Sequence, residues 1–353
     1  MPFDPAPLGA EDEYSSADDT QLLSVSVILP VRNEARFIER LLTELVGQDY
    51  DRRRFEVIVV DGDSTDDTPA LVSRFAERHS NVHLLRNPKR WSSAARNIGI
   101  RAARGDVVVI IDGHCEIGDD QFLTKLATAF VTSGADCLGR PQPLDVSQAN
   151  TLQRAIAAAR SSRLGHHPES YIYASEAQFV PAKSVAVAYR RSAFDLVGYF
   201  DEDFDACEDY EFNHRIDLAG LRCYFTPEVA VRYVPRGSLP GLFRQMIRYG
   251  RGRIRLLRKH PGSASVSTFV PAVFVLGLAI GLPLSFISPW LTAAYVGALL
   301  AYLSIVLLAS LEVLLRSGNL SLLPWLPVVF ATIHVGSGVG LLLEFVVPQA
   351  NCR

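Results

Sequence analysis

Acidic and polar side chains follow three short apolar runs in the first third of the chain. The runs are SVSVILP, FEVIVV and VVVII, and the residues after them include Arg32 and Glu34, Asp61 and Asp63, and Asp112 and His114. A single end of this kind is explained by a turn or a helix cap, where Asp, Asn and Ser are common. Three such ends on neighbouring strands predict a ligand site.

Asp112 and His114 are the candidate metal ligands in this group. Alternate residues after a strand can point the same way, and oxygen and imidazole ligands accept Mg²⁺ or Mn²⁺, with Mn²⁺ the more tolerant of nitrogen. Such a cation would bind a diphosphate and neutralise it as it leaves. For Asp-Gly-His alone, a turn with an ordinary histidine is the competing interpretation.

A second acidic pair, Glu208-Asp209, precedes a helical run that ends near Gly220. A carboxylate here could take the proton from an attacking hydroxyl. The alternative is that both acids only favour the positive end of a helix dipole.

The elements that must position these side chains alternate between strand and helix. Strands are predicted over about 24–30, 55–60, 82–85 and 107–111, and helices over about 34–48, 66–78 and 92–104. Continuous apolar strands separated by helices predict a mainly parallel α/β sheet covered on both faces. In such a sheet, ligands bind outside the carboxyl ends of the strands, where the polar residues stand.

The last third of the chain is apolar. No Asp, Glu, Lys or Arg occurs between His260 and Glu312, and a further uncharged run follows from Ser317 to Leu343. Since a spanning helix needs about 20 apolar residues, we predict three spans at about 267–287, 290–312 and 322–345. Basic residues before the first span and Arg316 after the second favour a cytoplasmic catalytic part, with the Ser288 turn and the C-terminal tail outside.

A basic segment, residues 238–262, precedes the first span. Its arginines recur at helical spacing and its apolar residues form another face, which predicts a helix in the membrane interface, broken into two pieces at Gly250 and Gly252. A solvated basic helix is the alternative. In the last span, Gly336, Gly338 and Gly340 predict close helix packing, and His334 is predicted to be a hydrogen-bonded interior histidine.

The predicted organisation is a disordered acidic tail (1–22), a catalytic domain (23–237), the basic interfacial segment (238–262), a region of three spans (263–348) and a short tail (349–353). The formal net charge of −3 gives no indication of a nucleic-acid partner. None of the five cysteines forms a CxxC pair, which argues against a zinc site or a disulfide framework and suits a reducing compartment. His166-His167 is predicted to lie in a surface loop.

Five motifs occur in a fixed order: LPVRNE, VVDGDSTDDT, ARNIGI, IIDGH and EDYEFNHRI. Together they cover about residues 24–220, and their order and spacing resemble glycosyltransferase family 2, which has the GT-A fold. Asp-Gly-His stands where that family usually has DxD. This departure is similar to bacterial polysaccharide glycosyltransferases of the succinoglycan-biosynthesis type.

The resemblance implies a role for each motif. Pro30, Arg32 and Glu34 would line the nucleoside pocket, Asp61 and Asp63 would belong to the donor site, and Arg96 would approach the donor's phosphates or sugar. Asp112 and His114 would bind the metal and diphosphate, and Asp209, beside Glu208, would be the general base. Gln245, Arg248 and Tyr249 form QxxRY, similar to a QxxRW motif near the acceptor and the diphosphate; binding of anionic lipid is the alternative for this segment.

The expected activity is an inverting transfer of a hexose from a UDP-sugar to a lipid-linked or polysaccharide sugar hydroxyl, with Mg²⁺ or Mn²⁺, at the inner membrane. The expected partners are the nucleotide-sugar donor, a lipid-linked saccharide and membrane lipid, with exopolysaccharide assembly proteins as further candidates and no nucleic acid. One alternative is a transferase acting on polyprenyl phosphate, whose ionised acceptor needs no general base. The other is a non-catalytic nucleotide-binding membrane protein.

Overall fold

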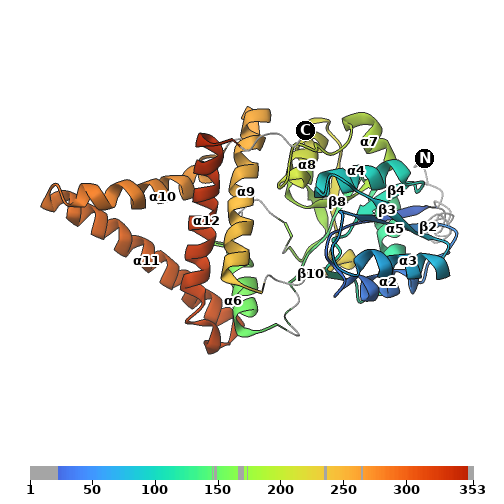
Figure 1. The fold of residues 1–353 in the computed structure, drawn as a ribbon, viewed down its shortest axis with the longest axis horizontal. Coiled ribbons are helices and arrows are strands. Elements are labelled where there is room, and N and C mark those ends of the chain that lie inside the picture. The colour runs from blue at the N-terminus through green and yellow to red at the C-terminus, as the bar shows by residue number, and fades with distance from the viewer. Residues whose placement is uncertain are drawn as a thin grey trace, which may run out of the picture.

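The structure, a computed structural model, describes residues 23–348 apart from 145, 147–148, 166–170, 173, 234–236 and 264. The predicted tails and the His166-His167 loop lie outside these residues. An α/β part and a layer of long helices from the last third of the chain lie side by side (Figure 1).

The described residues of the α/β part form an eight-stranded sheet in the order β3-β2-β1-β4-β8-β6-β9-β7. The parallel pairs are β1 with β2 and β4, β2 with β3, and β6 with β9, whereas β8 runs antiparallel to β4 and β6, and β7 antiparallel to β9. The strands are β1 (Val25–Val31), β2 (Phe55–Asp61), β3 (Val82–Arg86), β4 (Val107–Ile110), β6 (Cys137–Gly139), β7 (Gln178–Val180), β8 (Ala186–Arg190) and β9 (Cys223–Phe225). A separate antiparallel pair joins β5 (Cys115–Glu116) to β10 (Arg232–Tyr233).

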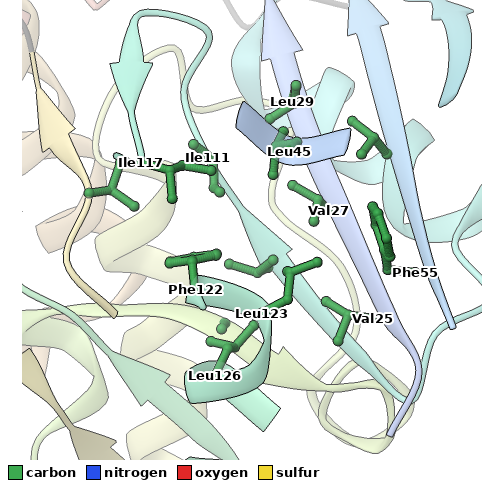
Figure 2. Close-up of a cluster of buried hydrophobic side chains, with 14 of the residues drawn as sticks. Val25, Val27, Leu29, Leu45, Phe55, Ile111, Ile117, Phe122, Leu123 and Leu126 are labelled. Carbon is green, nitrogen blue, oxygen red and sulfur yellow. The ribbon is translucent and has the colours of Figure 1, made fainter. Parts of the chain in front are cut away.

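Helices cover both faces of this sheet because its strands are apolar on both sides. Val25, Val27 and Leu29 of β1 share one core with α2 (Ile38–Val46), α3 (Thr68–Arg78) and α5 (Phe122–Ser133); Figure 2 shows part of this cluster. Ile28, on the other face, belongs to a second core with α4 (Ser92–Ala102), α7 (Arg191–Val197) and α8 (Glu208–Leu218). The predicted fold class, a mainly parallel α/β sheet covered on both faces and followed by apolar helices, is confirmed.

The helical layer begins with α9 (Leu239–Lys259), which is one continuous helix. The predicted break at Gly250 and Gly252 is therefore wrong. A Cβ at Gly250 would lie 2.3 Å from the Ser337 carbonyl oxygen, and one at Gly252 would lie 2.6 Å from the Ala206 carbonyl oxygen. These glycines let neighbouring backbones approach the helix, and packing on both sides offsets their low helix propensity.

Three further helices are long and apolar enough to cross a membrane: α10 (Val266–Ser285), α11 (Pro289–Ser317) and α12 (Leu326–Val346). The predicted close packing at the glycines of α12 is confirmed, since a Cβ at Gly340 would lie 2.2 Å from the Ile247 carbonyl oxygen. His334 is hydrogen-bonded, as predicted, with Nδ1 3.0 Å from the Tyr302 hydroxyl and Nε2 3.1 Å from the Leu164 carbonyl oxygen. The remaining described helices are α6 (Thr151–Arg160) and the short η1 (Ala182–Ser184), η2 (Pro227–Val229), η3 (Pro261–Ser263) and η4 (Leu320–Leu322).

Candidate active site

A cavity of 1270 Å³ opens at the carboxyl ends of β1, β2 and β4. Its other walls are the start of α4, the start of α8, one side of α9 and the end of α12. All of the predicted site residues except Asp61 and Asp63 line it: Pro30, Arg32, Glu34, Arg96, Asp112, His114, Glu208, Asp209, Gln245, Arg248 and Tyr249. Residues from strand ends and from distant helices therefore share one space.

Hydrogen bonds between neighbouring loops fix the ends of β1 and β2. The amide of Asn33 donates to Ser64 Oγ at 2.8 Å, and the Asn33 side-chain oxygen accepts from the amide of Thr65 at 2.8 Å. The amide of Glu34 donates to Thr68 Oγ1 at 2.9 Å. Asn33 has φ 58°, a left-handed conformation that asparagine tolerates better than most residues. This turn places Arg32 and Glu34 at the cavity wall.

Asp61 and Asp63 occupy different surroundings from the lining residues. Asp61 is buried, and its Oδ2 accepts from the amide of Ser64 at 3.0 Å, while no described group bonds its Oδ1. Asp63 faces Arg86 and Arg90, and hydrogen bonds from Arg90 and then Arg86 lower the pKa of its carboxyl group. Asp61 thus lies behind the wall formed by Gly62, and Asp63 positions Arg90, which itself lines the cavity.

Asp112 and His114 follow β4 and line the cavity beside Glu34. His114 Nδ1 is 2.9 Å from Glu34 Oε1, and its ring meets that of Tyr233 edge to face at a centroid distance of 4.5 Å. Within the described ranges, no group of three or more His, Cys, Asp or Glu side chains could hold a metal ion. Burial raises the pKa of the neighbouring Cys115 thiol to about 12, so it offers no thiolate ligand at neutral pH. Any cation here would rely on the oxygen and nitrogen of Asp112 and His114.

Arg96, on α4, connects the two acidic sides of the cavity. Its Nη1 is 3.4 Å from Glu208 Oε1, and both side chains are nearly buried. Burial lowers the pKa of Arg96, but the charges of Glu208, Asp209 and Asp112 outweigh that effect and raise it overall. Burial raises the pKa of Glu208 against the attraction of Arg96. The guanidinium is therefore the firmly charged member of this pair.

Asp209 differs from Glu208 although the two are adjacent at the start of α8. Asp209 is exposed and lines the cavity, whereas Glu208 is buried against Arg96. An exposed carboxylate at the cavity wall can accept a proton from a bound hydroxyl, and the buried one is committed to holding Arg96.

Gln245, Arg248 and Tyr249 lie on the side of α9 that faces the cavity. Gln245 Nε2 donates to the Tyr249 hydroxyl at 3.1 Å, and no described group bonds its buried Oε1. Arg248 donates to the carbonyl oxygen of Asp205. The arginine thus holds the loop that leads to Glu208 and Asp209, and the tyrosine remains partly exposed to the cavity.

The structure also brings residues to the site that the motifs did not indicate. Asp205 lies in the loop before α8 and accepts from Arg255 at 2.5 Å. Arg140, at the end of β6, is buried, and no described group bonds its Nε and Nη1. Burial lowers the pKa of Arg140, and the neighbouring Cys115 and Asp112 oppose that effect. Arg140 Nη2 donates to the carbonyl oxygen of Ile110, two residues before Asp112, at 3.4 Å. The sequence signal for Arg140 is its position directly after the short strand Cys137–Gly139.

Comparisons with known proteins show the family of the chain and its fold. The family model described as glycosyl transferase family 2 matches residues 26–196. The succinoglycan biosynthesis protein ExoA of Rhizobium meliloti (strain 1021) is 31% identical over 284 residues, which are 80% of this chain and 84% of that protein.

Two further proteins extend the comparison. The dolichyl N-acetyl-alpha-D-glucosaminyl phosphate 3-beta-D-2,3-diacetamido-2,3-dideoxy-beta-D-glucuronosyltransferase of Methanococcus voltae is 26% identical over 238 residues, 67% of this chain and 74% of that protein. The solved mannosyltransferase PcManGT from Pyrobaculum calidifontis, in complex with GDP-Man and Mn²⁺, has a TM-score of 0.56 at 23% identity. That likeness covers 91% of this chain and 88% of the other, and it shows a shared fold.

Proposed function

The chain belongs to glycosyltransferase family 2, and we propose that it moves a hexose from a UDP-hexose to a hydroxyl of a lipid-linked or polysaccharide sugar, with inversion. The single observation that carries this proposal is the shared cavity. The strand ends that hold Glu34 and Asp112 open into the same space as Asp209 at the start of α8. A donor and an acceptor bound in that space would meet between these walls.

The donor would occupy the end of the cavity formed by the strands. Pro30, Arg32 and Glu34 would contact the nucleoside, and the unbonded Oδ1 of Asp61 supports a hydrogen bond from the base or ribose behind Gly62. Arg96 and Arg90 would face the phosphates, because guanidinium groups suit phosphate oxygens. Buried Arg140 would add to the same positive potential.

A divalent cation fits the side chains at this end. Asp112 offers carboxylate oxygen and His114 imidazole nitrogen, both acceptable to Mg²⁺ or Mn²⁺. Mg²⁺ commonly takes one or two carboxylates from a protein and completes its shell with substrate phosphates and water. When bound, the ion would neutralise the leaving diphosphate. The side chains of Asp112 and His114 would hold it, and Glu34 would orient the His114 ring through the 2.9 Å contact to Nδ1.

Asp209 would act as the general base. It is exposed at the cavity wall, and it would take the proton from the acceptor hydroxyl as that oxygen attacks the sugar. Glu208 would act through Arg96, keeping the guanidinium between the base and the donor end. Since the two substrates must be aligned, positioning would supply much of the rate.

The acceptor would enter from the side formed by α9 and the end of α12. Gln245 and Tyr249 offer polar and aromatic contacts for a sugar, and Val347 and Pro348 add an apolar edge. The basic residues of α9 support a catalytic part on the cytoplasmic side of the inner membrane. A lipid-linked sugar would then reach the cavity without leaving the bilayer.

The test is a panel of nucleotide sugars supplied with Mn²⁺ to the full-length protein in lipid nanodiscs, with a lipid-linked sugar or polyprenyl phosphate as acceptor. We expect metal-dependent transfer from a UDP-hexose to the lipid-linked sugar, and a product linkage of opposite anomeric configuration to the donor by NMR. Transfer to polyprenyl phosphate alone would favour the alternative acceptor. Failure to turn over any donor would contradict the proposed activity.

The Asp209→Asn variant tests the base. It should bind UDP and Mn²⁺ as the wild type does in calorimetry, yet lose transfer by about 10²–10⁴-fold. Asp195→Asn is the matched control, because Asp195 is an exposed carboxylate on α7 outside the cavity. Full activity of the Asp209→Asn variant would remove Asp209 from this role.

A further inference from the structure

The last apolar helix, α12, contacts α6 near its start and the active-site cavity at its end. Near its start, Leu326 and Phe330 share a buried core with Ile156 of α6, and His334 bonds the carbonyl oxygen of Leu164. At its end, Val347 and Pro348 line the active-site cavity. A helix perpendicular to a bilayer would carry one of its ends to the far side, away from such contacts.

The helix α12 also lies alongside α9 over most of its length, and the two run in the same direction (Figure 1). Contacts advance together along both helices. A Cβ at Gly336 would lie 2.8 Å from Met246 Cβ, and one at Gly340 would lie 2.2 Å from the Ile247 carbonyl oxygen. Further on, Glu344 pairs with Arg251 and Arg255. The two helices therefore have the same orientation relative to any membrane, and their depths differ by at most one interaxial distance of about 8–10 Å.

The helix α9 is unsuited to the interior of a bilayer. Seven basic residues stand between 244 and 259, with no acid among them, and several of these line the active-site cavity. Charged side chains are expensive at the bilayer centre and occur at its interface with water. Because α9 belongs at the interface on the catalytic side, α12 belongs there with it.

Glu344 supports the same placement. It is 1% exposed and pairs with Arg251 at 3.2 Å, Arg255 at 3.2 Å and Arg258 at 3.5 Å. All three arginines belong to α9. The carboxylate near the end of α12 thus lies at the level of the basic helix and next to the active site.

The hairpin of α10 and α11 has the opposite character. Its helices project away from the sheet on the far side of α12 (Figure 1). In their most apolar windows, 6% of α10 and 22% of α11 are buried inside the protein, against 44% of α12. The tip is apolar and open, with Phe286 84% and Trp290 85% exposed. At 1.5 Å per residue, α10 is about 30 Å long, the thickness of the hydrocarbon core.

We propose that, of the described helices, α10 and α11 alone cross the bilayer, while α12 lies with α9 in the interface on the catalytic side. The partner of the hairpin is the lipid acyl chains, which would cover its exposed apolar side chains. The outer side of α12, including Phe345 and Val346, would rest on the same lipid. The chain after Pro348 would then lie on the same side as the active site. Three crossings, as the sequence alone predicts, would put it on the opposite side.

Cys352 and the hairpin tip distinguish the two topologies. Cys352 is four residues beyond Pro348, a reach of about 14 Å when extended, which is less than half of a hydrocarbon core of roughly 30 Å. The full-length chain and a Ser288→Cys, Cys352→Ser double variant would be expressed in a Gram-negative bacterium. Each would be treated with a membrane-impermeant maleimide in spheroplasts and in inverted vesicles. The Cys352→Ser single variant gives the background from Cys207, which is partly exposed.

We expect the thiol introduced at the hairpin tip to react only in spheroplasts, and Cys352 of the full-length chain only in inverted vesicles. Reaction of both in spheroplasts would establish three crossings and overturn the proposal. Reaction of both only in inverted vesicles would show that the hairpin does not cross, and would overturn it as well. UDP binding by each chain in the same membranes identifies correctly folded protein, and topology can be scored whether or not transfer is seen.

Discussion

The side of the cavity formed by the ends of β1, β2 and β4, which we call the donor side after its proposed role, is held by hydrogen bonds between adjacent loops. The side formed by α8 and α9, called the acceptor side after its proposed role, is held by ion pairs between segments far apart in the chain. On the donor side, the amides of Asn33 and Glu34 donate to the side chains of Ser64 and Thr68, which follow the neighbouring strand β2. On the acceptor side, Arg255 pairs with both Asp205 and Glu344.

The two kinds of support respond differently to substitution. A neutral hydrogen bond contributes about 0.5–1.5 kcal/mol to the free energy of unfolding. Removing one partner of a buried ion pair costs more, about 3–5 kcal/mol, because the remaining charge is left uncompensated. The acceptor side is therefore the part of the site whose geometry depends most on distant residues, including those of the helical layer.

The largest expected effect is on the donor side. Asp112→Asn should reduce transfer by about 10³-fold, because it removes the proposed charged ligand for a cation that stabilises the leaving diphosphate. Calorimetry of UDP with and without Mn²⁺ should show that metal-dependent binding is lost. The control, Asp51→Asn, lies before β2 at the opposite end of the strand and pairs with Arg53. If Asp112→Asn still binds UDP in an Mn²⁺-dependent manner, the proposed metal site on the donor side would be contradicted.

The next effect concerns the ion pair between Arg96 and Glu208, which joins the donor and acceptor sides of the cavity. Glu208→Gln should lower the free energy of unfolding by about 3–4 kcal/mol, because Arg96 would lose its nearest counter-charge in a buried position. The double variant Arg96→Met, Glu208→Leu should lose less than the sum of the two single changes. Apparent melting temperatures in nanodiscs would measure the series. Additive losses would mean that the pair does not couple α4 to α8.

The sequence predicts the donor side of the cavity better than the acceptor side. The strands β1 to β4 were predicted within one or two residues because each is a continuous apolar run bounded by polar residues. The strand-end site followed, because the carboxyl ends of parallel strands meet at one edge. The later strands, such as β6 and β7, have only three residues each and carry too short a pattern to predict.

On the acceptor side, the sequence predicts only the residues that belong to a motif. The motifs indicate Asp209 and Arg248, but no periodicity relates Glu344 to Arg255, which is 89 positions earlier. The glycines of α9 were misjudged for a related reason. Low helix propensity predicted a break at Gly250, whereas tertiary packing against α12 decided the outcome.

A third prediction concerns acid stability of the acceptor side. Burial raises the pKa of Glu211, but Arg215, Lys259 and His260 lower it overall to about 2. Because the folded pKa lies below the ordinary value of 4.5, this carboxylate stabilises the fold above about pH 4.5, and its contribution disappears as the pH falls toward 2. The shift corresponds to about 3 kcal/mol at neutral pH.

Unfolding curves between pH 7 and pH 3 would measure this contribution. Glu211→Gln should be less stable than the wild type at pH 7, and the gap between them should narrow as the pH falls. The control is the Glu228→Gln variant, because Glu228 lies on η2 and not on α8 or α9. A gap that stays constant with pH would mean that Glu211 stabilises the protein by packing and not by its charge.

The smallest expected effect tests whether α12, in the helical layer, supports the acceptor side. Glu344→Gln would weaken the link from α12 through Arg255 to Asp205, in the loop that leads to Asp209. A misplacement of about 1 Å at a reacting group can cost up to 10²-fold in rate. Since Arg248 still holds the Asp205 carbonyl oxygen, we expect a loss of roughly tenfold in kcat, which is about 1.4 kcal/mol.

UDP affinity should stay unchanged in Glu344→Gln, because the donor side makes its own local bonds. Glu312→Gln is the matched control, since Glu312 is a partly exposed carboxylate on α11 that pairs with Arg316 one helical turn away, and such pairs contribute little. Glu344→Asp should recover part of the lost rate if the charge matters. Equal losses of donor binding and transfer would mean that Glu344 on α12 also organises the strand ends. The two sides of the cavity would then not be supported independently.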